Sequence, residues 1–320
     1  MTALTEIAYQ RRGPAAWITL NRPAQRNALT PTMLAEAHQA LDLAEAHDEA
    51  RVLIVTGAPP AFCAGADLSF FRAMLNEPDG CDRFLAGVIH PLARLMARLR
   101  ASPRPVIAAV NGACAAGGLE LILACDLIVA AGNATFTDAH SRLGIAPAVG
   151  AAAGLARAVG EFRAKQILLL SEPVDATAMA GFGLVTDVTA PGQLDQRVSE
   201  LAGVLSRRSP VSFAAMKTMV HQAQQPSWEQ TLESDLAFFR RNWNSAAMRE
   251  GLAEGPARAH RLKRTNEATW PWRQARCIAC LGRPSLRRPV FPVTGQHPPY
   301  SGSRSRYPAR SHRTRPLDKI

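Results

Sequence analysis

The chain has 320 residues, of which 47% are hydrophobic, a composition that allows one large or two smaller buried cores. Residues 256–320 hold 15 of the 37 lysines and arginines and 2 of the 26 acidic residues, a net charge of +13, whereas residues 1–255 carry −2. This distribution excludes a uniformly basic body for nucleic-acid binding, and the absence of any run of about 18 apolar residues excludes a membrane-spanning helix.

The first half of the sequence predicts strands that alternate with helices. Short hydrophobic segments bounded by glycine or proline predict strands, and apolar residues at helical spacing predict helices. We expect two strands in residues 7–20 about a turn at Gly13 and Pro14, a helix that begins at Thr30 and Pro31, buried strands in residues 51–57 and 104–112, and a helix in residues 83–102 that Pro91 kinks or breaks.

The same alternation continues to about residue 190. A glycine-rich turn, a short helix near residues 119–124 and a strand in residues 126–132 follow one another, which is typical of an α/β fold with crossovers. Apolar stripes at helical spacing then predict three helices, in residues 194–208, 210–223 and 227–254. We therefore expect a core at residues 1–193, a helical region at residues 194–255 and a tail at residues 256–320.

The tail has the composition of a disordered segment, because it is rich in Pro, Arg, Ser and Gly and shows no sustained period. The alternative is an arginine-rich arm for nucleic acid, with Tyr300 and Tyr307 available for stacking. Cys277 and Cys280 form a CxxC without a second ligand pair, so we expect no metal site. The N-terminal residues lack the apolar core of a secretory signal, and we expect a cytoplasmic protein.

Two segments place small residues directly after strands. In AFCAGADL, residues 61–68, the small side chains around Gly65 let a ligand approach the backbone closely. In VNGACAAGGLELILACD, residues 110–126, Gly117 opens a helix whose first amides have no intrahelical partner and suit an oxyanion. Glu120 lies one turn further: it either stabilises its own helix or acts as a general acid or base, with a pKa raised by apolar neighbours.

The segment ATFTDAHSRLG, residues 134–144, places Asp138 and His140 two residues apart. In an extended chain, side chains two apart point to the same side, so these residues could present an acid and a base together. The alternative interpretation is a solvated turn at the surface.

These segments, with LNRPAQRNALT (20–30) and GFGLVTDV (181–188), occur in the order and spacing of the crotonase superfamily, the enoyl-CoA hydratases and isomerases. The sequence resembles that superfamily over about residues 4–252. The resemblance implies an α/β fold, a crotonase-like spiral of ββα repeats, with a helical C-terminal region that packs between subunits of a homotrimer or homohexamer. It implies an acyl-CoA thioester as the substrate and no cofactor beyond the coenzyme A of that substrate. From the composition we expect no membrane partner and, despite the basic tail, no nucleic-acid partner.

The resemblance also assigns roles to residues by position. The amides of Ala66 and Gly117 match the two donors of an oxyanion hole, where losing one donor typically costs about 2.7 to 4 kcal/mol. Glu120 matches the first catalytic glutamate of the hydratases, which helps to activate water. The positions that line the coenzyme A pocket correspond to Arg26, whose cation suits phosphates, and to Ala28, Ala64, Gly65, Ala66, Asp67, Leu68 and Gly117.

The second catalytic position departs from the family. The glutamate that exchanges a proton beside the carbonyl should lie fourteen residues after Asp126, and this position is His140. Either Glu120 performs both steps, or His140 replaces the missing acid with Asp138 tuning it, or the chain binds acyl-CoA and catalyses another reaction or none. Because the isomerases rely on the second position, Glu120 favours an enoyl-CoA hydratase-like lyase over a double-bond isomerase or a catalytically silent acyl-CoA-binding homologue.

A second departure lies in GIAPAVGAA, where Ala148 stands at a position that is commonly glycine in the family. We expect this alanine to reshape the acyl pocket.

Overall fold

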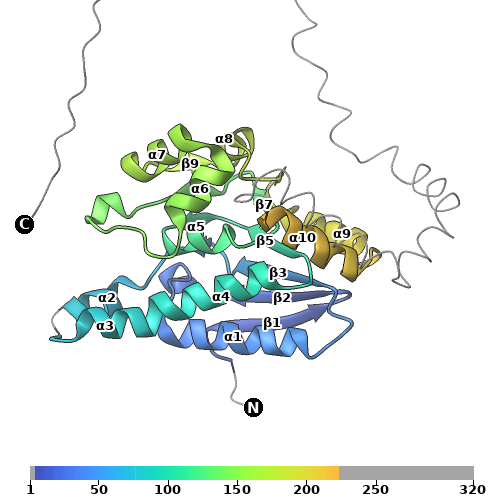
Figure 1. Ribbon diagram of the computed structural model, residues 1–320, viewed down its shortest axis with the longest axis horizontal. Coiled ribbons are helices and arrows are strands. Elements are labelled where there is room, and N and C mark those ends of the chain that lie inside the picture. Colours follow the sequence, from blue (N-terminus) through green and yellow to red (C-terminus); the bar gives the residue numbers. More distant parts are fainter. Residues whose placement is uncertain (1–3, 76, 223–320) are drawn as a thin grey trace, which may run out of the picture. The chain divides into compact units, whose positions relative to one another are not determined.

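The computed structural model describes residues 4–75 and 77–222 (Figure 1). The helix predicted in residues 227–254, the CxxC of Cys277 and Cys280, and the tail at residues 256–320 lie outside these described residues. No helix in the described ranges is long and apolar enough to cross a bilayer.

The described strands form two sheets. The larger sheet has six strands in the order β1 (Ile7–Arg12), β2 (Ala15–Leu20), β3 (Val52–Gly57), β5 (Val106–Val110), β7 (Leu127–Ala131) and β10 (Asp187–Thr189). The smaller sheet has four strands in the order β4 (Ala61–Cys63), β6 (Ala113–Ala115), β8 (Thr135–Thr137) and β9 (Val174–Asp175). The pairs β1–β2 and β8–β9 are antiparallel, and the other neighbours are parallel.

The chain crosses from the larger sheet to the smaller one in three successive repeats. β3 leads into β4, β5 into β6 and β7 into β8, and helical segments follow each pair. In the smaller sheet, Cys63 of β4 pairs with Cys114 of β6, and Ala115 pairs with Thr137 of β8. This repeat of two strands and a helical segment confirms the predicted α/β spiral, and it sets the ends of β4, β6 and β8 side by side.

The helices occupy the segments between the strands and after them. In chain order they are η1 (Pro23–Gln25), α1 (Pro31–Glu45), α2 (Leu68–Leu75), α3 (Gly80–Phe84), η2 (Leu85–Ile89), α4 (His90–Ala101), α5 (Gly117–Ile122), η3 (Ser141–Leu143), α6 (Ala151–Val159), α7 (Glu161–Leu170), α8 (Ala176–Phe182), α9 (Leu194–Ser206) and α10 (Pro210–Gln222). The described parts of the first two predicted C-terminal helices are thus confirmed as α9 and α10.

The six-stranded sheet is covered on both faces. On β2, Ile18 belongs to one buried cluster that includes residues of α1 and α4, whereas Trp17 belongs to a second cluster with Val198 of α9. Figure 1 shows α1 and α4 side by side along the sheet. Two covered faces explain why the parallel strands read as continuous hydrophobic runs and not as an alternation.

Two local predictions are confirmed in detail. Thr30 caps α1, since its side chain accepts a hydrogen bond from the amide of Met33 (2.9 Å), and Pro31 begins the helix. The irregularity expected near Pro91 is η2, a π-helical turn that ends just before α4. Proline has no amide hydrogen, and its ring conflicts with the carbonyl one turn earlier, so a regular helix does not run through this point.

Candidate active site

Three consecutive repeats deliver their loops to one edge of the smaller sheet. Residues 64–67 follow β4, residues 116–120 follow β6 and residues 138–140 follow β8. Because these strands are parallel neighbours, the three segments leave the sheet at their carboxyl ends, where open α/β sheets commonly bind ligands. The structure therefore brings together the segments that the sequence singled out.

Gly65 packs directly against the loop that follows β6. A Cβ atom added at Gly65 would lie 2.7 Å from the Cβ of Ala116 and 3.2 Å from the amide nitrogen of Gly117. Gly65 also has a φ of +91°, a conformation that suits glycine. The first two segments therefore lie too close together for a side chain at position 65.

The amides of Ala66 and Gly117 lie on the two sides of this contact. Among the described residues, neither amide donates a backbone hydrogen bond. Ala116, which precedes Gly117, has φ +46° and ψ −117°, an uncommon and costly conformation for a residue with a side chain. Both features are typical of a backbone that is held in place for a ligand.

Glu120 is buried one turn into α5, with 3% of its surface exposed. Its carboxylate accepts a hydrogen bond from the amide of Val149 (3.1 Å), just before α6. Burial raises the pKa of Glu120, and the amides of Val149 and Ala151 and the charge of His140 oppose this rise without cancelling it. The raised pKa suits a group that takes up and releases a proton.

Asp138 and His140 form the pair that the sequence suggested, but on a turn. The prediction of an extended chain is wrong here: β8 ends at Thr137, and Ala139 has a left-handed φ of +65°. One carboxylate oxygen of Asp138 lies 2.9 Å from Nδ1 of His140, and the other accepts the His140 amide at 3.1 Å. A short polar side chain that bonds the backbone two residues ahead stabilises such a turn, which is why the strand stops.

The pair is buried and interacts with Glu120. The side chains of Asp138 and His140 are 2% and 14% exposed. Burial disfavours the charged imidazole, but the hydrogen bond to Asp138 and the negative charges of Asp138 and Glu120 outweigh burial and raise the pKa of His140. Glu120 at the first expected catalytic position and His140 at the second therefore influence each other's pKa.

The positions expected to line a coenzyme A pocket lie on the loops beside this edge. Arg26 and Ala64 are exposed, and the Ala64 amide donates to the Arg26 carbonyl (3.0 Å). Ala28 is buried, and Leu68 is 42% exposed at the start of α2. The carboxylate of Asp67 is engaged within the protein, because it forms an ion pair with Arg22 (2.9 Å).

Sequence reasoning missed three contributors to this site: Arg22, Asn27 and the amide of Val149. The side-chain amide of Asn27 donates to the carbonyl oxygens of Ala58 (2.8 Å) and Ala61 (2.7 Å), and its φ is +57°. An asparagine in a loop is a signal for that conformation. Arg22 carried no such signal, because its partner Asp67 is 45 residues away in the sequence.

Two further features of the described residues concern metal binding and thiol chemistry. No group of three or more His, Cys, Asp or Glu side chains in residues 4–75 and 77–222 could hold a metal ion. The Cys63 thiol accepts a hydrogen bond from the Gly65 amide (3.4 Å). Burial raises the pKa of Cys63 to about 12, so the thiol is neutral near pH 7.

The chain is similar to several known proteins. The profile of the family described as Enoyl-CoA hydratase/isomerase matches residues 11–256. The chain is 34% identical to the 2,3-dehydroadipyl-CoA hydratase of Escherichia coli (strain K12) over 253 residues, which is 79% of this chain and 94% of that protein. It is 32% identical to the Short-chain-enoyl-CoA hydratase of Clostridium acetobutylicum over 69% of this chain and 83% of that protein.

A solved structure shows the same fold. The crystal structure of an enoyl-CoA hydratase from Polaromonas sp. JS666 superposes with a TM-score of 0.75 at 33% identity, covering 79% of this chain and 97% of that chain. The spiral of ββα repeats is therefore that of the crotonase superfamily. Within that superfamily, the chain belongs to the enoyl-CoA hydratase/isomerase family.

Proposed function

We propose that this protein is an enoyl-CoA hydratase, which adds water to the double bond of a 2-enoyl-CoA thioester. One observation carries the proposal: Glu120 and His140 interact at the carboxyl ends of β4, β6 and β8, and Asp138 holds His140 there. The Ala66 and Gly117 amides lie at the same strand ends. Relatives that are named as hydratases support the same reaction.

In this proposal the two amides donate hydrogen bonds to the thioester carbonyl oxygen. When water attacks the carbon two bonds from the carbonyl, negative charge moves onto that oxygen and an enolate forms. Donors that are already held by the fold stabilise this charge without rearranging, which makes them more effective than water. The tight contact at Gly65 fixes the spacing between the Ala66 and Gly117 loops.

Glu120 and His140 divide the proton transfers. Glu120 takes a proton from water while the water oxygen bonds to the β-carbon. The π electrons of the double bond move toward the thioester carbonyl, and an enolate forms. The imidazolium of His140 then gives its proton to the α-carbon. Transfer of a proton from Glu120 to His140 restores both groups, so the water's two hydrogens and oxygen are all accounted for.

The interaction between the two groups helps this sequence of steps. The negative charge of Glu120 contributes to the raised pKa of His140. Once Glu120 has taken a proton from water that charge is gone, so the pKa of His140 falls and the imidazolium becomes a stronger acid. The first proton transfer thus prepares the second.

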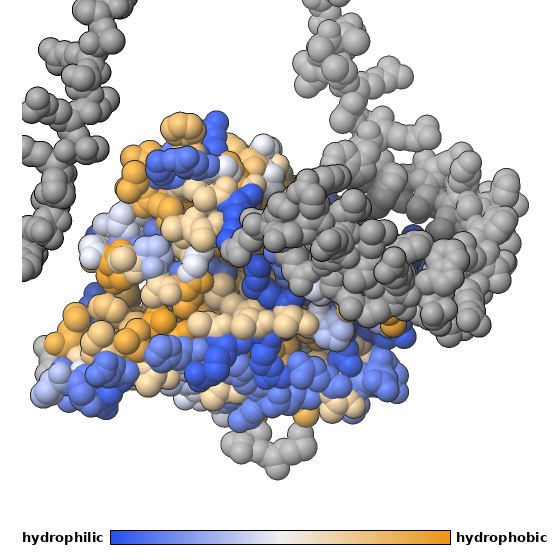
Figure 2. Space-filling view, viewed as in Figure 1, coloured by the Kyte–Doolittle hydropathy of each residue, from blue (hydrophilic) through white to orange (hydrophobic). Residues whose placement is uncertain are grey.

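We place the coenzyme A part of the substrate along the loops of Arg26, Ala28 and Ala64, with no further cofactor. Exposed apolar side chains flank the site, Leu68 at 42% and Leu143 at 52%, and suit a hydrocarbon acyl chain. On the face shown in Figure 2, hydrophobic surface gathers over α2 and over α7. Ala148 is exposed directly before the Val149 amide that holds Glu120, in keeping with an effect on this pocket.

We also propose a homotrimer or homohexamer and a cytoplasmic location. Exposed apolar side chains on α7 support the assembly: Phe162 is 84% exposed and Leu169 is 71% exposed. Patches of this kind commonly mark surfaces that another subunit covers.

The experiment that tests the function is a steady-state hydration assay with crotonyl-CoA on Glu120 and His140 variants. We expect Glu120→Gln to abolish hydration and His140→Ala to lower kcat by roughly 100-fold, the range of a lost general acid. Glu36→Gln is the matched control, because Glu36 is also buried, at 7% exposed, but bonds the backbone of β1. Full activity of Glu120→Gln contradicts the mechanism.

The same purified protein separates the alternatives. Turnover of a 3-enoyl-CoA without hydration of a 2-enoyl-CoA identifies an isomerase. Calorimetric binding of crotonyl-CoA without turnover of either substrate identifies a silent acyl-CoA-binding homologue.

A further inference from the structure

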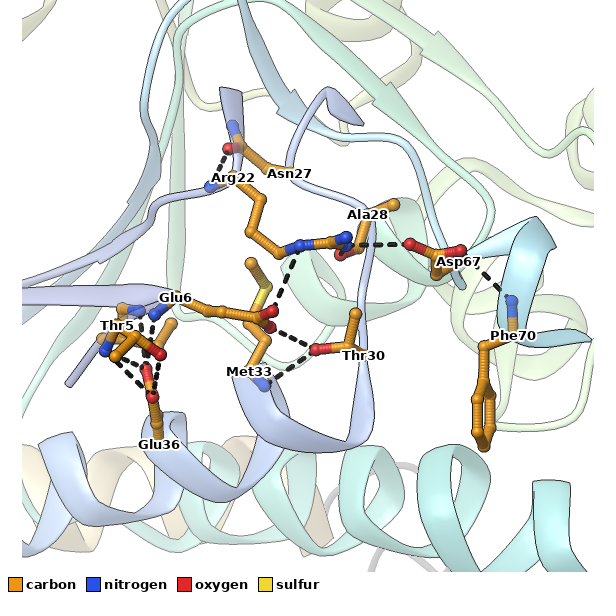
Figure 3. A network of polar contacts seen from close by, with 11 residues as sticks. Thr5, Glu6, Arg22, Asn27, Ala28, Thr30, Met33, Glu36, Asp67 and Phe70 are labelled. Carbon is orange, nitrogen blue, oxygen red and sulfur yellow. Dashed lines mark hydrogen bonds and ion pairs between the residues drawn. The ribbon is translucent and has the colours of Figure 1, made fainter. Parts of the chain in front are cut away.

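Arg22 connects the loop of Ala28 with the loop of Asp67 (Figure 3). Its Nη1 donates to the carbonyl oxygen of Ala28 (2.8 Å) and pairs with a carboxylate oxygen of Asp67 (2.9 Å). The side chains of Arg22 and Asp67 are 18% and 11% exposed. A largely buried guanidinium that bonds both loops restricts their relative movement.

The Asp67 end of this contact is anchored to α2. The second carboxylate oxygen of Asp67 accepts the amides of Ser69 (2.9 Å) and Phe70 (3.3 Å). Burial opposes the charged form, but these hydrogen bonds and Arg22 outweigh it and lower the pKa of Asp67. The ion pair is therefore fully charged at neutral pH.

The other end of Arg22 is anchored to α1. Its Nε faces a carboxylate oxygen of Glu6 (3.3 Å), and the other Glu6 oxygen accepts the hydroxyl of Thr30. Thr30 is the residue that caps α1 through the Met33 amide. The guanidinium thus lies between two carboxylates, each of which is fixed to the start of a helix (Figure 3).

Ala66 lies between two backbone bonds to Leu29. The Leu29 amide donates to the Gly65 carbonyl (2.8 Å), and the Asp67 amide donates to the Leu29 carbonyl (2.9 Å). In a parallel bridge of this kind, the amide of the middle residue points away from the partner chain. The direction of the Ala66 amide therefore depends on how the Leu29 loop and the Asp67 loop are held together.

We propose that Arg22 is a positioning residue for the reaction: by holding the Ala28 carbonyl and the Asp67 carboxylate, it fixes the Ala66 amide for the thioester oxygen. Arg22 acts through the backbone and does not touch the substrate. The inference rests on the proposed function of the Ala66 and Gly117 amides.

Two variants remove the contact from opposite sides. We expect Arg22→Gln and Asp67→Asn each to lower kcat for crotonyl-CoA roughly 10- to 100-fold, the scale for misplacing a reacting group by an ångström or less. KM should change less than about threefold, because the charge that the amide stabilises develops after binding. The double variant should lose little more than either single variant, since both remove one unit. Arg22→Lys should recover only part of kcat, because an ammonium cannot reproduce the planar fork of the guanidinium.

The direct readout is the carbonyl stretch of bound butyryl-CoA labelled with carbon-13 at the thioester, measured by difference infrared spectroscopy. This saturated thioester does not react. Hydrogen bonds from Ala66 and Gly117 should lower the stretching frequency on binding to the wild type. The lowering should be smaller in Arg22→Gln and Asp67→Asn at saturating ligand, which a loss of stability alone does not produce.

Arg197→Gln is the matched control. Arg197 pairs with Asp187 at 2.5 Å, the two side chains are 23% and 21% exposed, and the pair joins α9 to β10 away from the strand edge. Its removal should leave kcat and the carbonyl frequency unchanged.

The outcomes separate the two proposals. If wild type does not lower the carbonyl frequency, the amides are not an oxyanion site and the proposed function fails. If wild type lowers it and both variants lower it equally, Arg22 has no positioning role. Asp67→Asn keeps the shape of the side chain, so it decides the result even if Arg22→Gln does not fold.

Discussion

Asp138 holds both the ring and the backbone of His140, and this double contact sets the state of the imidazole. One carboxylate oxygen contacts Nδ1 and the other accepts the amide of the same residue. Because the Asp138 carboxylate beside Nδ1 favours the hydrogen on that nitrogen, we propose Nε2 as the nitrogen that exchanges a proton with the substrate. The pKa of His140 therefore depends on Asp138, which in our proposal does not contact the substrate.

We expect Asp138→Asn to lower the pKa of His140, because the variant removes a negative charge that favours the imidazolium. An NMR titration of the His140 ring, assigned by its loss in His140→Ala, measures the shift. Asp175→Asn is the control, since Asp175 is an exposed cap of α8 that bonds the Ala178 amide. An unchanged His140 titration in Asp138→Asn contradicts the coupling.

The raised pKa of His140 also predicts how the free energy of unfolding depends on pH. The folded-state pKa of His140 is raised. Its contribution to the free energy of unfolding is therefore complete below about pH 6.5, the pKa of an unperturbed histidine, and is lost as pH rises through the folded value. The free energies of unfolding in urea of wild type and Asp138→Asn should therefore differ more below about pH 6.5 than above the folded-state pKa of His140.

At the scale of elements, the sequence predicted the strands and helices well where one local signal dominates. Hydrophobic runs ending in glycine located β3 and β5, and a threonine followed by proline located the start of α1. Residues 134–140 were predicted less well, because an Asp side chain competes with the strand for backbone hydrogen bonds after Thr137. The order of motifs also predicted that three loops meet.

The sequence could not predict contacts between groups that are far apart along the chain. The Val149 amide that holds Glu120 is a backbone group, and no residue type marks it. The Arg22 contacts join segments that only the arrangement of β1, α1 and β4 brings together. A local pattern contains neither kind of information. The sequence could therefore predict which segments lie together, but not the groups that orient their side chains.

The contact between the β4 and β6 loops yields a prediction at this scale. Gly65→Ala should lower kcat by roughly 100-fold, because the added Cβ would push against Ala116 and displace the Ala66 amide from Gly117. Gly13→Ala is the control, since Gly13 also has a positive φ, +56°, but an added Cβ there has nothing within 4 Å. Hydration assays on both variants separate crowding at the site from the cost of the backbone conformation. Equal, small losses contradict the role of the contact.

At the scale of the whole chain, charge and chemistry are separated along the sequence. The residues that we place in the reaction and its support lie between Glu6 and Ala151, whereas the excess positive charge belongs to residues 256–320. A tail of this charge attracts polyanions in a salt-dependent way whatever the body does.

A chain ending at Gly255 should therefore retain the kcat of the full chain for crotonyl-CoA. Both chains should sediment as the trimer or hexamer that we propose, and only the full chain should bind a heparin column at low salt. Parallel hydration assays, analytical ultracentrifugation and salt elution measure the three quantities. Loss of activity or assembly in the shorter chain assigns the tail a role that our proposal does not include.

Because the site is built from three successive repeats, different loops carry different parts of the proposed reaction. In our proposal, the loops after β4 and β6 present the two amides, and α5 and the turn after β8 present Glu120 and His140 for the proton transfers. Position 140 can therefore change its residue type while the hydrogen bonds that hold Gly65 and Asp67 stay as they are. If the proposed roles hold, such a scaffold can exchange one proton donor for another within a single turn of chain, and so acquire a different reaction while the proposed thioester site stays unchanged.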